Sequence, residues 1–203
     1  MIKSYNYPIE LKRALIDSYL DGFLIGSFTT NLDNNMPMWA HYTNNHKGFC
    51  IEYEIYKPKF FYKVSYENER IEINNIIMNT INLILKDIEN GLTNKERNNL
   101  EMYNQILFHN SIIKHKSWKY ENEYRLLLPK EVLKKFIPIT ETGGLVNNEV
   151  MGIKPTGIYI GMAATKNTIQ RLIQISNKLS ISAYDMYFDD KSTSYELKYK
   201  KVN

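Results

Sequence analysis

The chain has 203 residues, of which 43% are hydrophobic and 24% are charged, and its formal net charge is +4. This length suffices for one domain with a substantial core, and 16 tyrosines, 8 phenylalanines and 2 tryptophans argue against a long disordered stretch. A charge this small does not indicate a nucleic-acid partner, although it leaves one open.

Cys50 is the single cysteine, which excludes an internal disulfide and a cysteine-based zinc site. Residues 1–7 lack the apolar core of a signal peptide, and no apolar run is long enough to span a membrane. We therefore expect a cytoplasmic protein with no membrane partner.

The first third of the chain combines helical and strand patterns. Apolar spacing predicts a helix over residues 8–20, a buried strand over 23–28 and a polar loop over 29–35. Pro37 is expected in the first turn of a short helix, with Gly48 as the left-handed residue after its end.

Beyond Gly48 the apolar period changes to two, which predicts a strand. Its apolar face would carry Phe49, Ile51, Tyr53 and Ile55, and its other face Cys50, Glu52 and Glu54. Residues 60–66 are a candidate partner strand, reached through a turn at 57–59.

A helical hairpin is expected over about residues 70–115. An amphipathic stripe predicts a helix over 70–90 that ends at Gly91. Thr93 and Glu96 form a capping box, which should begin an antiparallel second helix that runs to about Lys114.

The last part of the chain alternates strands with one helix. Strands are expected over 118–129 and 157–162, and Thr165 should cap a helix that runs to about 179. Residues 181–188 and 194–200 should form a hairpin. No regular strand–helix–strand repeat or Gly-rich phosphate loop occurs, so we expect one α+β domain over 1–203, with a mainly antiparallel sheet, an inserted helical hairpin and flanking helices.

Four residues of the short helix are candidates for a ligand site: Trp39, His41, Tyr42 and His46. Histidine suits proton transfer near neutral pH, and the two aromatic rings could stack on a base or nicotinamide. Alternatively, the helix is an aromatic plug of the sheet whose histidines bond to backbone carbonyls. The histidines are five residues apart, not four, so we expect no metal site.

Glu121, Glu123 and Arg125 form a second candidate group, because alternate residues of a strand share one face. Two close carboxylates raise one another's pKa and can act as acid or base, while Arg125 could pair with them or bind a phosphate. The alternative is a solvated strand face with balanced charges.

Lys114, His115 and Lys116 precede Trp118 and could form a phosphate-binding edge. The alternative is the cationic last turn of a helix, where positive charge interacts favourably with the helix dipole.

Three stretches, in this order, resemble a bacterial domain family of unknown function: Met-Trp-Ala-His-Tyr at 38–42, His-Lys-Gly-Phe-Cys-Ile-Glu-Tyr at 46–53 and Lys-Ser-Trp-Lys-Tyr-Glu-Asn-Glu-Tyr-Arg at 116–125. Ile-Tyr-Ile-Gly at 158–161 resembles a later strand of that family. The amino-terminal part of the family pattern, with its Asn-Asp-Pro segment, is missing, so we expect a shortened copy or one that depends on a partner chain or oligomer.

The order of these motifs is similar to that of ADP-ribosyltransferases. That similarity implies NAD as the cofactor, Trp39 or Tyr42 as the stacking ring and Glu121 or Glu123 as the late catalytic glutamate. We add His41 as a catalytic candidate and His46, Lys47 and Arg125 as binding candidates.

We therefore expect an NAD- or nucleotide-using transferase that acts in bacterial stress or phage defence. One alternative is a non-catalytic interaction module whose two motifs form the core. A third is a nucleic-acid-processing enzyme, which would need a carboxylate cluster with a metal ion.

Overall fold

The computed structural model describes residues 10, 13–14, 17, 21–32, 35–130, 139–140, 143–144, 147–189, 191, 193 and 196–203. Most of the helix expected over 8–20 and parts of the loop expected over 29–35 lie outside these residues. The chain divides into two compact units, which we describe separately. The first contains residues 1–27, 62–119 and 124–144, and the second 28–61, 120–123 and 145–203. The single domain stays a prediction.

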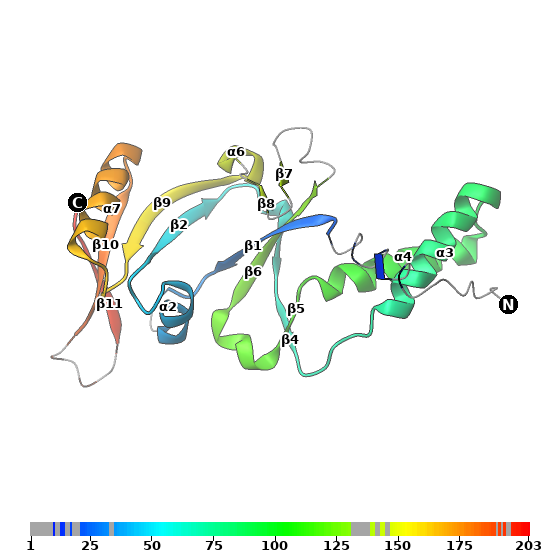
Figure 1. Cartoon of the computed structure of the whole chain (residues 1–203), viewed down its shortest axis with the longest axis horizontal. Coiled ribbons are helices and arrows are strands. Elements are labelled where there is room, and N and C mark those ends of the chain that lie inside the picture. Colours follow the sequence, from blue (N-terminus) through cyan, green and yellow to red (C-terminus); the bar gives the residue numbers. More distant parts are fainter. Residues whose placement is uncertain are drawn as a thin grey trace. The chain divides into compact units, whose positions relative to one another are not determined.

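The first unit contains most of a three-stranded sheet (Figure 1). Its order is β1 (Phe23–Thr29), β6 (Glu123–Pro129) and β3 (Phe61–Lys63). The central strand β6 buries Leu126, Leu127 and Leu128. The strand expected over 23–28 is confirmed. It is only partly buried, with Ile25 53% exposed, because it lies at the edge of the sheet.

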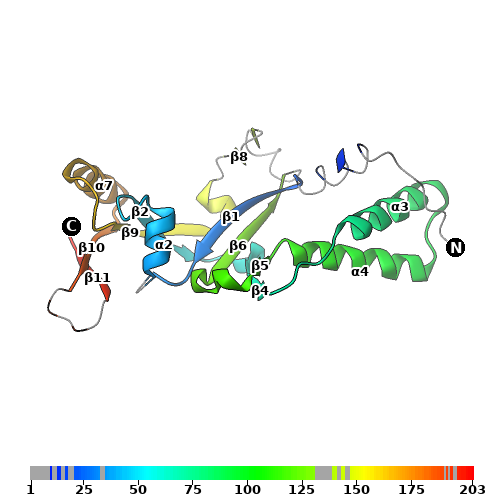
Figure 2. The ribbon, with the colours of Figure 1, turned by 60° about the horizontal axis from the view of Figure 1, so that its bottom comes forward.

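A helical hairpin forms the second part of this unit. Helices α3 (Asn74–Asn90) and α4 (Asn94–Asn110) run antiparallel, as Figure 2 shows. Gly91 ends α3 with φ of 73°, and the Thr93–Glu96 capping box begins α4, both as expected. Helix α4 ends at Asn110, earlier than expected, because the chain then enters β5 (Ile113–His115), which pairs in parallel with β4 (Ser65–Glu67). The remaining strands here are β7 (Ile139–Thr140) and β8 (Gly143–Gly144).

The second unit is built on a four-stranded sheet with the order β11-β10-β9-β2. The strands are β2 (Phe49–Ile55), β9 (Ile153–Ile160), β10 (Ser182–Phe188) and β11 (Leu197–Lys201). The β9–β10 pair is parallel, and the β2–β9 and β10–β11 pairs are antiparallel. The expected α+β class with mainly antiparallel pairing is confirmed.

Each face of this sheet is covered by a different helix. Helix α7 (Lys166–Leu179), capped by Thr165 as expected, packs Leu172 against Ile158 and Ile160. Tyr159 points to the opposite face, since side chains alternate along a strand. There it forms a cluster with Trp39 of α2 (Met36–Tyr42), Met186 and Leu197. A short helix, α6 (Asn148–Met151), precedes β9.

The sequence pattern predicts two faces for β2 without deciding which one is covered, and the covered face is the one that carries Cys50. Cys50 packs against the Trp39 cluster, whereas Phe49 and Ile51 are 47% and 37% exposed. The reason is that α2 covers the Cys50 face of this edge strand. Its partner is β9, not residues 60–66, which form the 3-10 helix η1 (Pro58–Phe60) and then β3 and β4.

The turn after α2 also differs from expectation. Pro37 lies in the first turn as predicted, but the left-handed residues are Asn44, Asn45 and His46, with φ of 51°, 54° and 63°, and not Gly48. Gly48 instead lies close to the end of α2, where an added Cβ would be 3.1 Å from the carbonyl oxygen of Thr43.

The strand predicted over 118–129 begins only at Glu123. Residues Lys116–Glu121 form the 3-10 helix η2, and Asn122 has φ of 43°, which interrupts an extended chain. The strand expected over 157–162 is longer than predicted and begins at Ile153.

Candidate functional site

A set of side-chain hydrogen bonds holds residues 120–122 within the second unit. Asn35 Nδ2 donates to the carbonyl oxygen of Tyr120 at 2.7 Å, and Thr29 Oγ1 donates to that of Glu121 at 2.6 Å. Asn122 Nδ2 donates to Thr30 Oγ1. These bonds satisfy backbone carbonyls that lie outside a strand ladder, and they fix the position of Glu121.

The same Asn35 also begins helix α2. Its Oδ1 accepts a hydrogen bond from the backbone N–H of Met38 at 3.4 Å, and its side chain is buried. The helix therefore starts at a fixed point, which turns Trp39 inward and Tyr42 outward. Trp39 is 3% exposed and its Nε1 donates to the carbonyl oxygen of Leu32 at 3.4 Å, whereas Tyr42 is 61% exposed.

Tyr42 and Glu121 join the two sequence motifs. The Tyr42 hydroxyl donates to Glu121 Oε1 at 2.8 Å, although the two residues are 79 positions apart. Glu121 is 2% exposed, so this contact brings a buried carboxylate to an exposed aromatic ring. Hydrogen bonds to a buried charged group are among the stronger ones in proteins.

Both motifs fall inside one family match. Residues 38–126 match DUF2971. The family is described as a protein of unknown function, so the resemblance expected from the motifs is confirmed over these residues. Searches of curated proteins and of solved structures find no match to the chain.

The sequence suggested that Glu121 and Glu123 of the DUF2971 segment share one face of a strand. The structure shows that they do not. Glu121 ends η2, whereas Glu123 begins β6 on the far side of Asn122. Both carboxylates are buried, with 2% and 4% of their surface exposed. Arg125 lies in the first unit, where its guanidinium donates to the carbonyl oxygen of Ser111 at 2.6 Å.

The remaining candidates of the DUF2971 segment surround the end of α2. His41 and Lys47 are exposed. The His46 ring stacks on Trp39, with centroids 6.5 Å apart and planes 10° apart. Among the described residues its Nδ1 is buried without a hydrogen-bond partner, and burial lowers the pKa of His46. This position is held by the backbone, because the carbonyl oxygen of His46 accepts from Ala163 N at 2.9 Å.

A further carboxylate, Glu52 of β2, lies on the same face of its strand as Cys50. Its carboxylate accepts hydrogen bonds from Thr156 Oγ1 at 2.8 Å and from the Tyr159 hydroxyl at 3.4 Å. Burial and the nearby Glu52 raise the pKa of the Cys50 thiol and of Tyr159. Gly157 on the paired strand leaves room for this carboxylate, since an added Cβ would lie 3.1 Å from Glu52 Oε2.

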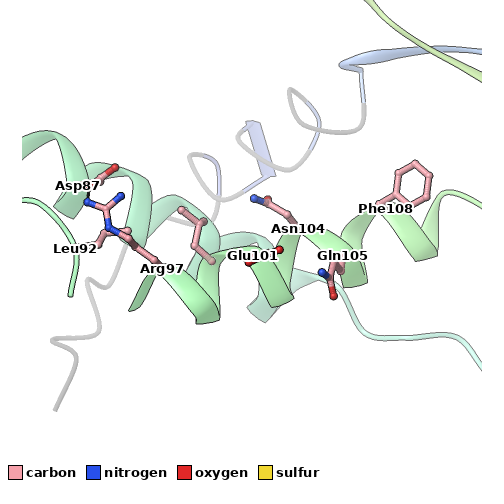
Figure 3. A pocket seen from close by; sticks show the side chains of 8 residues that line it. Asp87, Leu92, Arg97, Glu101, Asn104, Gln105 and Phe108 are labelled. Atoms are coloured by element: carbon pink, nitrogen blue, oxygen red, sulfur yellow. Dashed lines mark ion pairs between the residues drawn. The ribbon is translucent and has the colours of Figure 1, made fainter. Parts of the chain in front are cut away.

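A hollow on the described residues lies elsewhere. It has a volume of about 510 Å³ and follows one side of α4 in the first unit, as Figure 3 shows. Arg97 and Asp87 pair at its end, and no candidate residue lines it. Within the described part of the chain, no three His, Cys, Asp or Glu side chains gather in a way that could hold a metal ion, and no helix is long and apolar enough to cross a membrane.

Proposed function

We propose that this chain is an NAD- or nucleotide-using transferase whose chemistry resembles that of ADP-ribosyltransferases. Glu121 is the catalytic carboxylate of this proposal, and Tyr42 is the ring that receives the nicotinamide or base. The observation that carries the proposal is the 2.8 Å hydrogen bond between them, which places a buried carboxylate beside an exposed aromatic surface.

In such a transfer, the bond between the ribose carbon and the nicotinamide nitrogen breaks, and nicotinamide leaves with the electron pair. Positive charge then develops on the ribose. A carboxylate stabilises this charge most strongly where water is excluded, and Glu121 is 2% exposed. The acceptor attacks the ribose carbon and releases its proton, which His41, exposed one position before Tyr42 on α2, can take.

Tyr42 contributes in two ways. Its hydroxyl fixes the orientation of the Glu121 carboxylate, and its ring remains 61% exposed for stacking. Trp39 is the less suitable stacking ring, since it is packed in the core cluster and 3% exposed.

The direct test is NAD consumption and nicotinamide release, followed by chromatography. We expect Glu121→Gln to lower turnover by about 100- to 1,000-fold, the usual cost of removing one group that stabilises charge in the transition state. Glutamine keeps the size of the side chain and an oxygen that can accept from Tyr42. Glu52→Gln on β2 is the matched control, because the Glu52 carboxylate also accepts a hydrogen bond from a tyrosine hydroxyl, that of Tyr159 on β9.

The proposal fails if the protein neither consumes NAD nor gains thermal stability with NAD, ADP-ribose or other nucleotides, since a ligand of the native state must stabilise it. It also fails if Glu121→Gln and Glu52→Gln have equal effects on turnover.

A second candidate function is a binding module, and the exposed apolar residues of β2 favour it. Phe49, Ile51 and Ile55 are 47%, 37% and 40% exposed on a strand at the edge of its sheet. Edge strands with apolar side chains can pair with a strand of another chain. Under this function no nucleotide shifts the melting temperature, and the protein shows no turnover of NAD. The double replacement of Phe49 and Ile51 by serine abolishes partner binding.

A further inference from the structure

The segment between β5 and β6 carries basic and aromatic side chains that the proposed transferase does not use. Five consecutive residues, 115–119, are exposed, and they include Lys116, Trp118 and Lys119. Trp118 is 38% exposed, whereas tryptophan side chains are on average largely buried. We call Lys114, Lys116, Trp118 and Lys119 the basic-indole surface; all four belong to the first unit.

The structure removes the simpler explanation for these charges. If Lys114 ended a helix, its charge would be explained by the helix dipole. Helix α4 ends at Asn110, however, and Lys114 lies in strand β5. The helix dipole therefore does not account for the lysines around Trp118.

Local geometry orients the indole and sets two of the lysines on one side of a short helix. In a 3-10 helix residues three apart lie on the same side, separated along the axis by about 6 Å, so Lys116 and Lys119 of η2 project from one side. Lys114 Nζ lies 5.0 Å from the centroid of the Trp118 ring, a cation–π contact that orients the indole. The backbone N–H of Ser117 donates to His115 Nδ1 at 3.3 Å, which holds the start of the turn.

The segment that carries this surface contains basic residues and no acidic ones. Residues 113–120 contain no carboxylate. Glu67 of β4 lies opposite His115 in the strand register, and its carboxylate accepts from Ser65 Oγ at 2.6 Å. Lys116 and Lys119 thus lie exposed beside the indole, in a segment without a carboxylate.

We propose that the basic-indole surface binds single-stranded nucleic acid. The indole of Trp118 stacks on one base, and the ammonium groups of Lys116 and Lys119 contact neighbouring phosphates of the extended strand. Every base has a face that can stack, so this binding tolerates many sequences. The small size of the surface favours a single strand over a duplex, since η2 is too short to fill a major groove. The proposal does not involve Glu121 or Tyr42, so it can hold or fail independently of the transferase.

The test is fluorescence anisotropy of a labelled oligo-dT strand titrated with the full chain at several salt concentrations. We expect Trp118→Ala to weaken binding by about 5- to 100-fold, the range that base stacking on one aromatic side chain supplies. Replacing both Lys116 and Lys119 by glutamine should reduce the slope of log affinity against log salt by about 1.4, since each phosphate contact on a single strand contributes about 0.7.

The matched control is the double replacement of Lys166 and Lys178 by glutamine on α7, which removes the same charge from exposed positions. It should leave the salt slope unchanged. Trp118→Phe, which keeps a ring, should bind more tightly than Trp118→Ala. The indole provides a second readout, because Trp39 is 3% exposed and Trp118 is 38% exposed, so quenching of fluorescence on binding should disappear in Trp118→Phe.

Three results would overturn the proposal. The first is no binding at low salt, and the second is binding that Trp118→Ala and the lysine replacements leave unchanged. The third is equal or tighter binding of duplex DNA or of polyglutamate, which would identify a duplex-binding or an acidic-protein-binding surface instead.

Discussion

Replacing Gly161 by alanine should destabilise the second unit strongly. An added Cβ would lie 2.7 Å from the carbonyl carbon of His46 and 2.9 Å from the carbonyl oxygen of Gly48, and still closer to the carbonyl oxygen of His46. All of these are backbone atoms, which cannot swing away as a side-chain end can. The turn after α2 and the turn after β9 would have to separate.

The expected cost follows from what this separation breaks. Two hydrogen bonds join these turns, from Gly161 N to Gly48 O and from Ala163 N to His46 O, each 2.9 Å long. Overpacking costs about 1–3 kcal/mol and each hydrogen bond contributes about 0.5–1.5 kcal/mol, so Gly161→Ala should lower the free energy of unfolding by about 2–6 kcal/mol.

Urea unfolding followed by circular dichroism measures this loss, with Gly157→Ala as the matched control on β9. At Gly157 the nearest atom to an added Cβ is Glu52 Oε2, at 3.1 Å, the mobile end of a side chain. That variant should change stability by less than about 1 kcal/mol. If Gly161→Ala unfolds at the same urea concentration as the parent chain, the close approach of the two turns is refuted.

Three other predictions concern single groups. Tyr42→Phe removes the hydroxyl that donates to the buried Glu121, which should cost about 1.5–3 kcal/mol in urea unfolding, and a cost near zero would contradict the contact. Hydrogen bonds from Lys86 and Thr93 lower the pKa of Glu96 to about 2, so its contribution to stability is complete above its ordinary value of 4.5 and is lost as pH falls from there towards 2. Thermal melting at pH 7 and pH 3 should therefore show a smaller difference in Glu96→Gln than in the parent. Burial lowers the pKa of His46, so the native state binds its proton less readily than the unfolded chain, and stability should fall as pH drops below 6.5. His46→Gln should flatten that part of a melting-temperature profile, and an unchanged profile would contradict the buried ring.

The features predicted correctly from sequence are those that neighbouring residues decide. The Thr93–Glu96 capping box, Pro37 in a first turn and Gly91 at a helix end each depend on backbone groups within four positions. Such signals act before tertiary packing is settled, and all three lie where the sequence placed them.

The orientation of β2 could not be predicted in this way. Alternation shows that a strand has two faces, but it does not show which face another element covers. Here Trp39 of α2 and Tyr159 of β9 meet the side of β2 that carries Cys50, and the more apolar side remains exposed. Because β9 follows about 100 residues later and pairs with β2, the deciding contacts are distant in sequence.

The error at residues 118–122 has a different cause. Aromatic and polar residues alternate in this segment, which is typical of a strand. In the structure, however, the carbonyl of Tyr120 accepts a hydrogen bond from the Asn35 side chain, and that of Glu121 accepts one from Thr29. A carbonyl that already has a side-chain donor does not need a ladder partner, so a 3-10 turn is tolerated there. Nothing within the 118–122 segment identifies donors that lie 85 or more positions away.

The same side-chain donors explain how Glu121 reaches Tyr42. A regular strand would have placed both glutamates on one face and left the choice between them open. The bonds from Asn35 and Thr29 hold residues 120–121 out of the strand and beside the start of α2, and Asn35 is also the residue that caps this helix. One buried amide thus sets the start of α2 and the position of the η2 end, and the 2.8 Å contact between Tyr42 and Glu121 depends on both. Replacement of Asn35 should consequently disturb the candidate site more than replacement of Asn44 or Asn45, two exposed residues of the turn that follows α2.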